Sequence, residues 1–315
     1  MRTAFFGKGG TGKTTFAAAY TEYLQQKGEK VLAIDADHNQ HLGETLNIPV
    51  DKKIGNYEKE IKQYVKGDRN ETIISSTPPS AKSNFIRLGE NNKLLRKFTT
   101  KKDNISLLTV GSYEKEDKGA TCYHGKQDSL ALLLNHLLDT KEDNIVIDGT
   151  AGVDSYGSSL ATAFDVSILL IEPTKKSISV YKEFKDLTES IHTETFIVVN
   201  KVELEEDKEF IQQHIPEEEI LGYVERSTNL RKFEQGHSES FKAFVKENKE
   251  VFKRINKETR KRGKDWEAYL DNLKEVHKGV SESWYDEYYN EPLSKQANTD
   301  FTYQDAIHKD TTRKA

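Results

Sequence analysis

Residues 7–15 of this 315-residue chain read GKGGTGKTT, and this stretch decides the fold. The apolar run AFF at 4–6 precedes it, and FAAAY at 16–20 follows with the composition of a helix. A strand, a glycine-rich loop and a helix in this order are the setting of a phosphate-binding loop. Glycines let successive backbone N–H groups turn toward a phosphate, and the helix N-terminus adds further N–H groups and partial positive charge. A glycine-rich turn with an incidental lysine would not explain the flanking strand and helix.

The side chains of this loop have distinct expected roles. The spacing G-x-x-x-x-G-K-T predicts that Lys13 reaches the β- and γ-phosphates of a bound nucleotide and that the Thr14 hydroxyl is a ligand of Mg²⁺. The residues expected to hold the phosphates are Gly7, Gly9, Gly10, Thr11, Gly12, Lys13, Thr14 and Thr15.

The composition limits the class of protein. The chain carries 47 Lys and Arg and 52 Asp and Glu, a net charge of −5, and 35% hydrophobic residues. Its length suffices for a sizeable core, and the near balance of charge argues against whole-protein affinity for nucleic acid, leaving a local basic patch open. One cysteine excludes an intrachain disulfide. With no apolar run of membrane-spanning length and no signal peptide, the sequence predicts a cytoplasmic protein.

The loop with its early lysine, Lys8-Gly-Gly-x-Gly-Lys-Thr-Thr, resembles the deviant Walker A motif of the superfamily of MinD, ParA and the nitrogenase iron protein. The resemblance implies that Lys8 reaches across an ATP-bound homodimer to the partner's phosphates, where it would stabilise charge as an arginine finger does. Without the motif, Lys8 would read as a solvated loop lysine.

Acidic residues follow two predicted strands, which places them at the ligand-facing edge of a parallel sheet. The run 31–34 ends in Asp35-Ala36-Asp37, and the run 144–147 ends in Asp148. The resemblance implies that Asp37, in switch I, positions the attacking water, although His38 replaces the proline usual there. It also implies that Asp148 holds Mg²⁺ through water and that the Gly152 N–H senses the γ-phosphate. Helix capping is the alternative for Asp37 and Asp148.

Cys122-Tyr123-His124 occupies the place of metal-binding motifs in relatives. Two copies of Cys122 and His124 facing each other across a dimer axis would supply a tetrahedral Cys₂His₂ set suited to Zn²⁺ or Ni²⁺. The alternative is a small buried thiol beside a surface imidazole that caps the following helix. Ala151 stands where the iron protein has its second cluster cysteine, which argues against an iron–sulfur cluster.

Apolar runs at 105–110, 166–171, 195–199 and 220–224 complete the predicted strands. Asn200 follows one of them, and the resemblance implies that it bonds the adenine edge; a plain turn asparagine is the alternative. The sequence thus predicts an α/β fold, a doubly wound and mostly parallel sheet with helices on both faces, as in P-loop NTPases.

Two segments depart from this pattern. Residues 47–104 form a polar insertion within a predicted ATPase domain at 1–238, and residues 239–315 form a charged helical extension. Apolar residues at helical spacing in the extension predict a face packed on the protein, with membrane or nucleic-acid contact as alternatives. These residues are Phe241, Phe244, Val245, Phe252 and Ile255.

The resemblance implies a slow, Mg²⁺-dependent ATPase that dimerises on binding ATP and acts as a switch for a protein client. The carbon monoxide dehydrogenase accessory (nickel insertion) branch is the one it most resembles. Two alternatives stay open: a ParA- or MinD-like positioning or DNA-partition ATPase, and a nucleotide-gated scaffold for a dedicated partner. The polar C-terminus, DTTRKA, argues against a terminal membrane helix.

Overall fold

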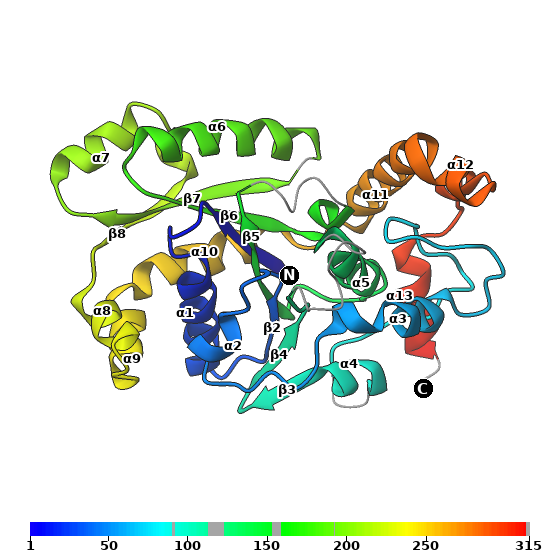
Figure 1. Ribbon diagram of the computed structural model, residues 1–315, viewed down its shortest axis with the longest axis horizontal. Helices are drawn as coiled ribbons and strands as arrows, with labels where there is room; N and C mark the ends of the chain where they lie inside the picture. Colours follow the sequence, from blue (N-terminus) through cyan, green and yellow to red (C-terminus); the bar gives the residue numbers. More distant parts are fainter. Residues whose placement is uncertain (90–91, 113–122, 153–158, 192, 313–315) are drawn as a thin grey trace.

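Eight strands form one sheet in the computed structural model, which describes residues 1–89, 92–112, 123–152, 159–191 and 193–312 (Figure 1). The strand order is β3-β4-β2-β5-β1-β6-β7-β8, and all neighbours run parallel except β3 and β4. The strands are β1 (Arg2–Gly7), β2 (Val31–Asp35), β3 (Thr99–Lys102), β4 (Ile105–Thr109), β5 (Asn144–Ala151), β6 (Val166–Ile171), β7 (Glu194–Val202) and β8 (Ile220–Glu225). The predicted mostly parallel sheet is confirmed.

Helices cover both faces of the sheet, because strand side chains alternate between two apolar layers. In β1, Ala4 and Phe6 enter one core cluster and Phe5 enters the other. The first layer contains α3 (Glu58–Lys66), α4 (Lys93–Phe98), α5 (Tyr123–Asn135), α6 (Lys175–Ser190), α7 (Glu205–Gln212), α11 (Trp266–Val280) and α13 (Tyr303–Thr312). The second contains α1 (Lys13–Gln26), α2 (Leu42–Thr45), α9 (Glu239–Glu247) and α10 (Lys249–Arg262). None of the described helices is long and apolar enough to cross a lipid bilayer.

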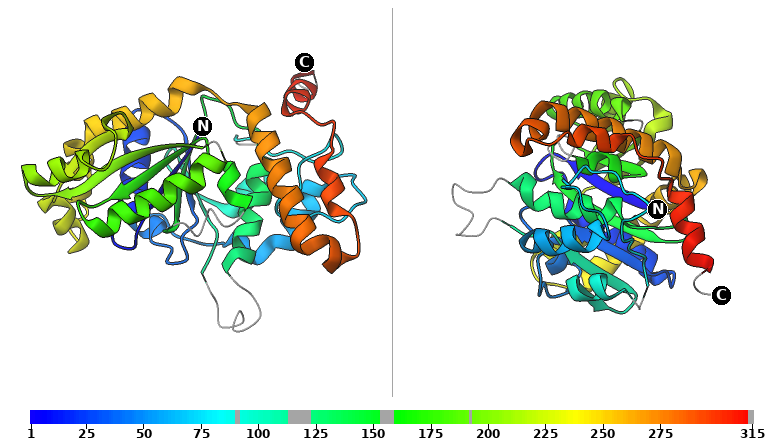
Figure 2. Two further views of the ribbon diagram at one scale, coloured as in Figure 1. Left: turned by 90° about the horizontal axis from the view of Figure 1, so that it is seen from above. Right: turned by 90° about the vertical axis from the view of Figure 1, so that its right-hand side faces the viewer.

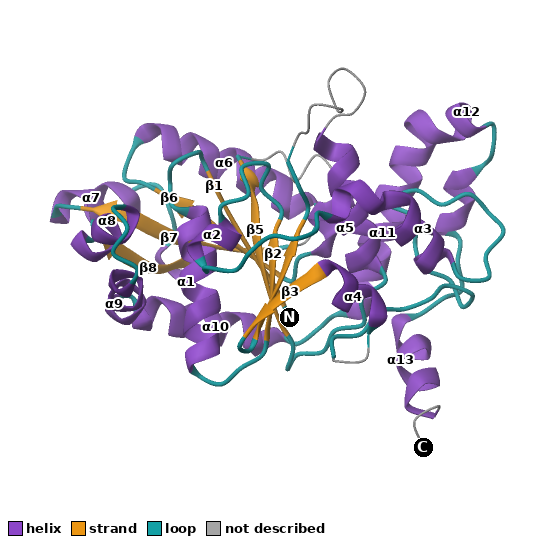
Figure 3. Cartoon of the chain, turned by 60° about the horizontal axis from the view of Figure 1, so that its bottom comes forward, coloured by secondary structure: helices purple, strands orange, loops and turns teal. Residues whose placement is uncertain are grey.

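The sheet order decides where a ligand site can form. Strand β1 lies between β5 and β6, so the loop after it has the carboxyl ends of β2 and β5 on one side and of β6 and β7 on the other. Figure 3 shows β1 with β5 and β2 on one side and β6 and β7 on the other. Ligands of open α/β sheets bind outside these carboxyl ends. The antiparallel edge strand β3 was not predicted, because its sequence TTKK is exposed and charged, as edge strands often are.

The apolar face of the C-terminal extension packs on the sheet's second layer, as the sequence predicts, but as two helices. Asn248 separates α9 from α10. Phe244 of α9 and Phe252 of α10 each lie 5.9 Å, centroid to centroid, from the ring of Phe16 in α1. The extension therefore covers the helix that follows the glycine-rich loop. The boundary between 1–238 and 239–315 stays a prediction.

The rest of the extension crosses to the first layer and contacts the 47–104 segment (Figure 2). The rings of Phe85 and Phe301 stack with centroids 5.4 Å apart. The Ser76 hydroxyl lies 3.0 Å from His277 Nδ1, and the Tyr303 hydroxyl donates to the Asn135 carbonyl at 2.7 Å. The two segments that depart from the family pattern are thus packed against each other and against α5.

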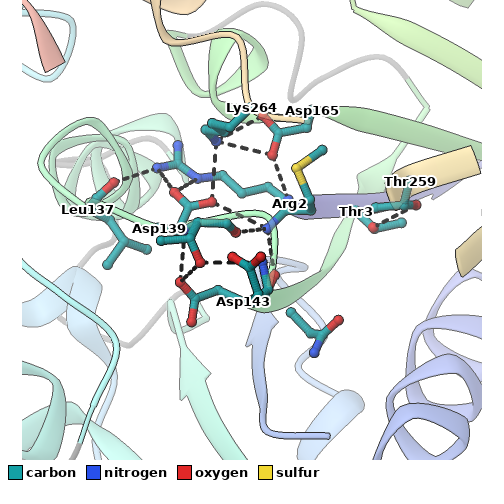
Figure 4. A network of polar contacts seen from close by, with 12 residues as sticks. Arg2, Thr3, Leu137, Asp139, Asp143, Asp165, Thr259 and Lys264 are labelled. Carbon is teal, nitrogen blue, oxygen red and sulfur yellow. Dashed lines mark hydrogen bonds and ion pairs between the residues drawn. The ribbon is translucent and has the colours of Figure 1, made fainter. Parts of the chain in front are cut away.

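A buried ionic network joins the extension to the first strand (Figure 4). Arg2 is completely buried and donates to Asp139 Oδ1 from Nε at 3.0 Å and from Nη2 at 2.7 Å. Lys264, at the entrance to α11, lies 3.4 Å from Asp139 Oδ2 and 2.8 Å from Asp165 Oδ1. These cations hold the pKa of Asp139 well below its usual range, against the opposing effect of burial. Paired in this way, the charges can be buried at tolerable cost.

Candidate functional site

The glycine-rich loop leaves β1 at Gly7 and enters α1 through Gly12, which has φ 100°. A Cβ at Gly7 would lie 2.5 Å from the Leu170 carbonyl oxygen, and one at Gly12 would lie 2.7 Å from Asn200 Nδ2. Glycine is therefore required at both ends of the loop. All the residues expected to hold phosphate, from Gly7 to Thr15, lie between the end of β1 and the first turn of α1. The N-terminus of α1 supplies the free N–H groups that phosphate binding needs.

Lys13 and Asp37, assigned separately from the sequence, are in contact. Lys13 Nζ lies 3.2 Å from Asp37 Oδ2, and both side chains are nearly buried. The Asp37 Oδ1 atom accepts from the Asn39 backbone N–H at 3.1 Å and lies 3.1 Å from His38 Nδ1. The carboxylate is thus held in one orientation by the chain that follows it. His38, which replaces the proline usual in the family, contributes to this.

Asp148 is the most isolated charge of the site. It pairs in register with Asp35 across β5 and β2, and it is completely buried. Neither of its carboxylate oxygens has a hydrogen-bond partner among the described residues. Burial, and next the Asp35 charge, raise the pKa of Asp148, while the Thr14 hydroxyl and Lys13 act in the opposite direction. Burial also raises the pKa of Asp35 to about 7, although its Oδ2 accepts from the Leu42 N–H at 3.1 Å.

These oxygens fit a magnesium ion. Buried carboxylates without partners are costly, and a divalent cation removes that cost. The described residues contain no group of three or more His, Cys, Asp and Glu that could hold a metal. Thr14 and Asp148 would therefore share the ion with phosphate oxygens and water, as is usual for Mg²⁺. Cys122 lies outside the described residues, as does the side chain of His124.

The end of β7 fixes the loop from the other side. Asn200 is buried; its Nδ2 donates to the Thr11 carbonyl at 2.8 Å, and its Oδ1 accepts from the Lys201 N–H at 2.9 Å. Lys201 has φ 60° and bridges two oxygens, with Nζ 2.7 Å from the Gly10 carbonyl and 2.6 Å from Glu172 Oε1. The Asn200 amide is engaged with the loop here, and its role toward adenine stays a prediction.

Sequence reasoning missed Lys201 and Glu172. Glu172 follows β6 and Lys201 lies near the end of the adjacent strand β7. Opposite charges at the carboxyl ends of two predicted strands were the sequence signal that could have predicted this ion pair. Gly152, expected to sense the γ-phosphate, has φ 71° and donates its N–H to the Gly7 carbonyl at 3.0 Å. The segment that follows Asp148 is therefore hydrogen-bonded to the start of the glycine-rich loop.

A cleft of about 930 Å³ opens at the loop. Lys13, Thr14 and Asp37 line one part, and Leu230, Phe233 and Phe241 line another. These three apolar residues belong to α8 (Thr228–Glu234) and α9, for which the sequence suggested no role in the site. Its volume is that of a pocket for a ligand of nucleotide size.

Comparison with known proteins agrees with this geometry. Residues 3–241 match the model of the CobQ/CobB/MinD/ParA nucleotide binding domain. The chain belongs to this family. It is an ATP-binding protein of the P-loop NTPase fold, and the match ends within α9, so α10 to α13 lie beyond it.

Two curated relatives illustrate the similarity. An uncharacterized ATP-binding protein of Methanocaldococcus jannaschii is 31% identical over 231 residues, covering 71% of this chain and 84% of the relative. The carbon monoxide dehydrogenase accessory protein CooC of Rhodospirillum rubrum is 25% identical over 225 residues, covering 71% and 83%.

Solved structures agree in fold. The cell division ATPase MinD of Pyrococcus furiosus superposes with a TM-score of 0.51 at 19% identity, over 82% of this chain and 99% of that one. A ParA family ATPase of Chlorobium tepidum superposes with a TM-score of 0.54 at 15% identity, over 82% and 96%. At these identities the likeness concerns the fold alone.

We expect Lys201→Met to weaken ATP binding about tenfold, because the loop loses the charged contact that holds the Gly10 carbonyl. Equilibrium titration with a fluorescent ATP analogue measures the change. Lys176→Met, which removes an exposed lysine from the nearby α6, serves as the matched control. Equal affinities of the two variants would show that Lys201 does not position the loop.

Asp148→Asn should alter how stability depends on pH. Folded Asp148 keeps its proton to higher pH than the unfolded chain does, so it makes the free energy of unfolding fall as pH rises above the unfolded value of about 4. Removing the carboxylate should therefore raise that free energy at pH 8 more than at pH 5. Urea unfolding without metal or nucleotide measures both, with the exposed Asp186→Asn as control. An equal effect at the two pH values would contradict the assignment.

Proposed function

We propose that this chain is a slow, Mg²⁺-dependent ATPase that works as a dimeric molecular switch. The observation that carries the proposal is the contact between Lys13 of the loop and Asp37, 3.2 Å apart beside the carboxylate of Asp148. The cleft thus brings together a phosphate-binding cation and an acid able to orient water, and Asp148, an acid able to hold a metal, lies buried near both.

The chain's own groups would divide the work as follows. The loop N–H groups and Lys13 would bind the phosphates, and Thr14 and, through water, Asp148 would hold the metal. Mg²⁺, when bound, neutralises charge on the β- and γ-phosphates. Asp37 accepts a hydrogen bond from the attacking water and takes its proton as the water oxygen bonds to the γ-phosphorus, while the bond from that phosphorus to the β–γ bridging oxygen breaks and ADP keeps the bridging oxygen.

The Lys13–Asp37 contact also supports a switching role. A γ-phosphate would compete with Asp37 for the same ammonium group, since Lys13 contacts Asp37 and is the lysine expected to bind the phosphates. Binding of ATP would then release Asp37 toward water and alter the segment that follows it, through the contacts of Asn39 and His38. A change of this kind in a loop is a common way to control partner affinity.

Dimerisation is the role proposed for Lys8. Lys8 is exposed, while its carbonyl oxygen accepts from the Thr11 N–H at 3.1 Å and from the Thr11 hydroxyl at 2.8 Å. Its backbone is thus fixed within the loop and its side chain is accessible to a second protomer. A cation supplied in trans would stabilise transition-state charge.

Asp37→Asn should retain ATP binding and reduce hydrolysis about 100-fold or more, because asparagine preserves the shape but cannot accept the water's proton. Phosphate release and nucleotide affinity are measured on the same preparations.

Lys8→Ala should still bind ATP as a monomer but lose ATP-dependent dimerisation, which sedimentation measures. Hydrolysis by Asp37→Asn at the wild-type rate would refute the role of Asp37, whatever the result for Lys8.

For the client we favour a protein that is matured or assembled, because a relative is described as an accessory protein of carbon monoxide dehydrogenase. The printed names of other relatives and neighbours, MinD and plasmid partition proteins, keep a positioning or DNA-partition role as the second candidate. Retention on DNA at low salt only when ATP is bound would favour that second candidate. A cytoplasmic location fits either, given the single cysteine.

A narrower proposal concerns Cys122 and His124, which would bind Zn²⁺ or Ni²⁺ between protomers. We expect about one metal ion per dimer, lost on Cys122→Ser, because two Cys-x-His pairs complete one tetrahedral site. Metal content and oligomeric state are measured together on untagged protein, with and without ATP and Mg²⁺. A nucleotide-driven dimer without metal would refute metal handling and leave the ATPase proposal intact.

A further inference from the structure

The helix α11 continues without interruption into a π-helical turn, η6 (Ser281–Tyr285), and then into α12 (Asp286–Tyr289). The buried residues of α11 recur at helical spacing and form its inner face: Trp266, Tyr269, Leu270, Leu273 and His277. Ser281 is buried on the same side. At that spacing the next inward positions would be Trp284 and Tyr288.

The π turn places these two aromatic residues in solvent instead. Trp284 is 76% and Tyr288 is 78% exposed. A π turn inserts one extra residue, so the half-buried Tyr285 takes the inner position, and its ring stacks on that of Tyr289, which is 37% exposed, with centroids 6.1 Å apart. Such turns are rare and frequently lie at functional sites. An apolar pair that would have continued the core stripe is therefore turned outward by a specific feature of the backbone.

The support beneath this exposed pair is ordered. His277 Nε2 lies 3.0 Å from the Leu293 carbonyl, and Asp286 accepts from the Ser294 N–H at 3.0 Å and from its hydroxyl at 2.6 Å. Asn290, with φ 52°, ends the helix in the left-handed conformation. The backbone that carries the aromatic pair is fixed in this way, so it loses little conformational freedom when a partner binds.

The segment of chain that carries the pair is acidic. Between Ser281 and Glu291 the chain carries four acidic residues and neither lysine nor arginine. We call Trp284, Tyr288, Glu282, Glu287 and Glu291 the aromatic–acidic surface. Glu287 follows Trp284 by three residues, a spacing that brings side chains together on a helix. Lysine and arginine side chains can bind both kinds of group on such a surface. They form ion pairs with the carboxylates and cation–π contacts with the aromatic rings.

We propose that the aromatic–acidic surface docks a segment of a partner protein rich in lysine and arginine. The surface lies at the end of the molecule opposite α7 and β8, and it lies beyond residue 241, where the family match ends (Figures 1 and 2). This partner is thus recognised by a part of the chain outside the nucleotide-binding domain. Fixed aromatic residues within a polar rim are the usual anchors of protein interfaces.

The full-length protein is panned against displayed short peptides of random sequence, in parallel with the Trp284→Ala/Tyr288→Ala variant. We expect lysine and arginine to be enriched about twofold or more among the peptides selected by the wild-type protein. Affinity for a selected peptide should fall about tenfold or more in the double variant. It should also fall in Glu282→Gln/Glu287→Gln and with rising salt.

Leu204→Ala, which removes a 62% exposed side chain at the start of α7, is the matched control and should bind like wild type. Selection of peptides without basic residues, or equal binding by the double variant, would overturn the proposal. Sedimentation of the wild-type protein and of Trp284→Ala/Tyr288→Ala gives a further test. If the wild-type protein forms an oligomer that this variant alone loses, a second copy of this chain occupies the surface, which also overturns the proposal. ATP hydrolysis in each variant shows that the nucleotide site is intact.

Discussion

An excess of buried negative charge at the ends of β2 and β5 is the constraint on which the rest of the site depends. Asp35, Asp37 and Asp148 lie close together, and Lys13 is the cation in contact with one of them. Burial raises the pKa of Asp35 and Asp148, so ionising both without further positive charge is unfavourable. A site with this imbalance favours ligands that arrive with a divalent cation, which is how ATP is bound in cells. These buried carboxyl groups destabilise the fold, as is common for residues that a functional site requires.

Most of the fold follows from patterns that the sequence carries locally. The continuous apolar runs that became β2, β6 and β8 are the mark of strands buried on both faces, and the loop at 7–15 fixes the order of β1 and α1. Edge strand β3 could not be predicted, because its half-buried Thr and exposed Lys residues resemble a loop. The break at Asn248 was missed for a related reason: the apolar spacing continues across it, and spacing alone does not register a change of helix direction.

The candidate site was predictable where a motif fixes it and not where packing fixes it. Lys13, Asp37 and Asp148 are named by position within strand–loop patterns, and the structure brings them together. The clamp made by Lys201 and Glu172 depends on two strands being neighbours, which the sequence does not state. Leu230 and Phe233 enter the cleft only because α8 and α9 fold back over it. Contacts between distant segments are the part that local patterns leave undetermined.

The network around Arg2 has a consequence for how the chain is made. Strand β1 leaves the ribosome long before Lys264 and Tyr269, which also contacts the Arg2 guanidinium, are synthesised. Until α11 is available, the Arg2–Asp139 pair at the base of the central strand lacks part of its surroundings. This part of the fold would then form only after the later helices dock, leaving a long interval in which chaperones can engage the nascent chain.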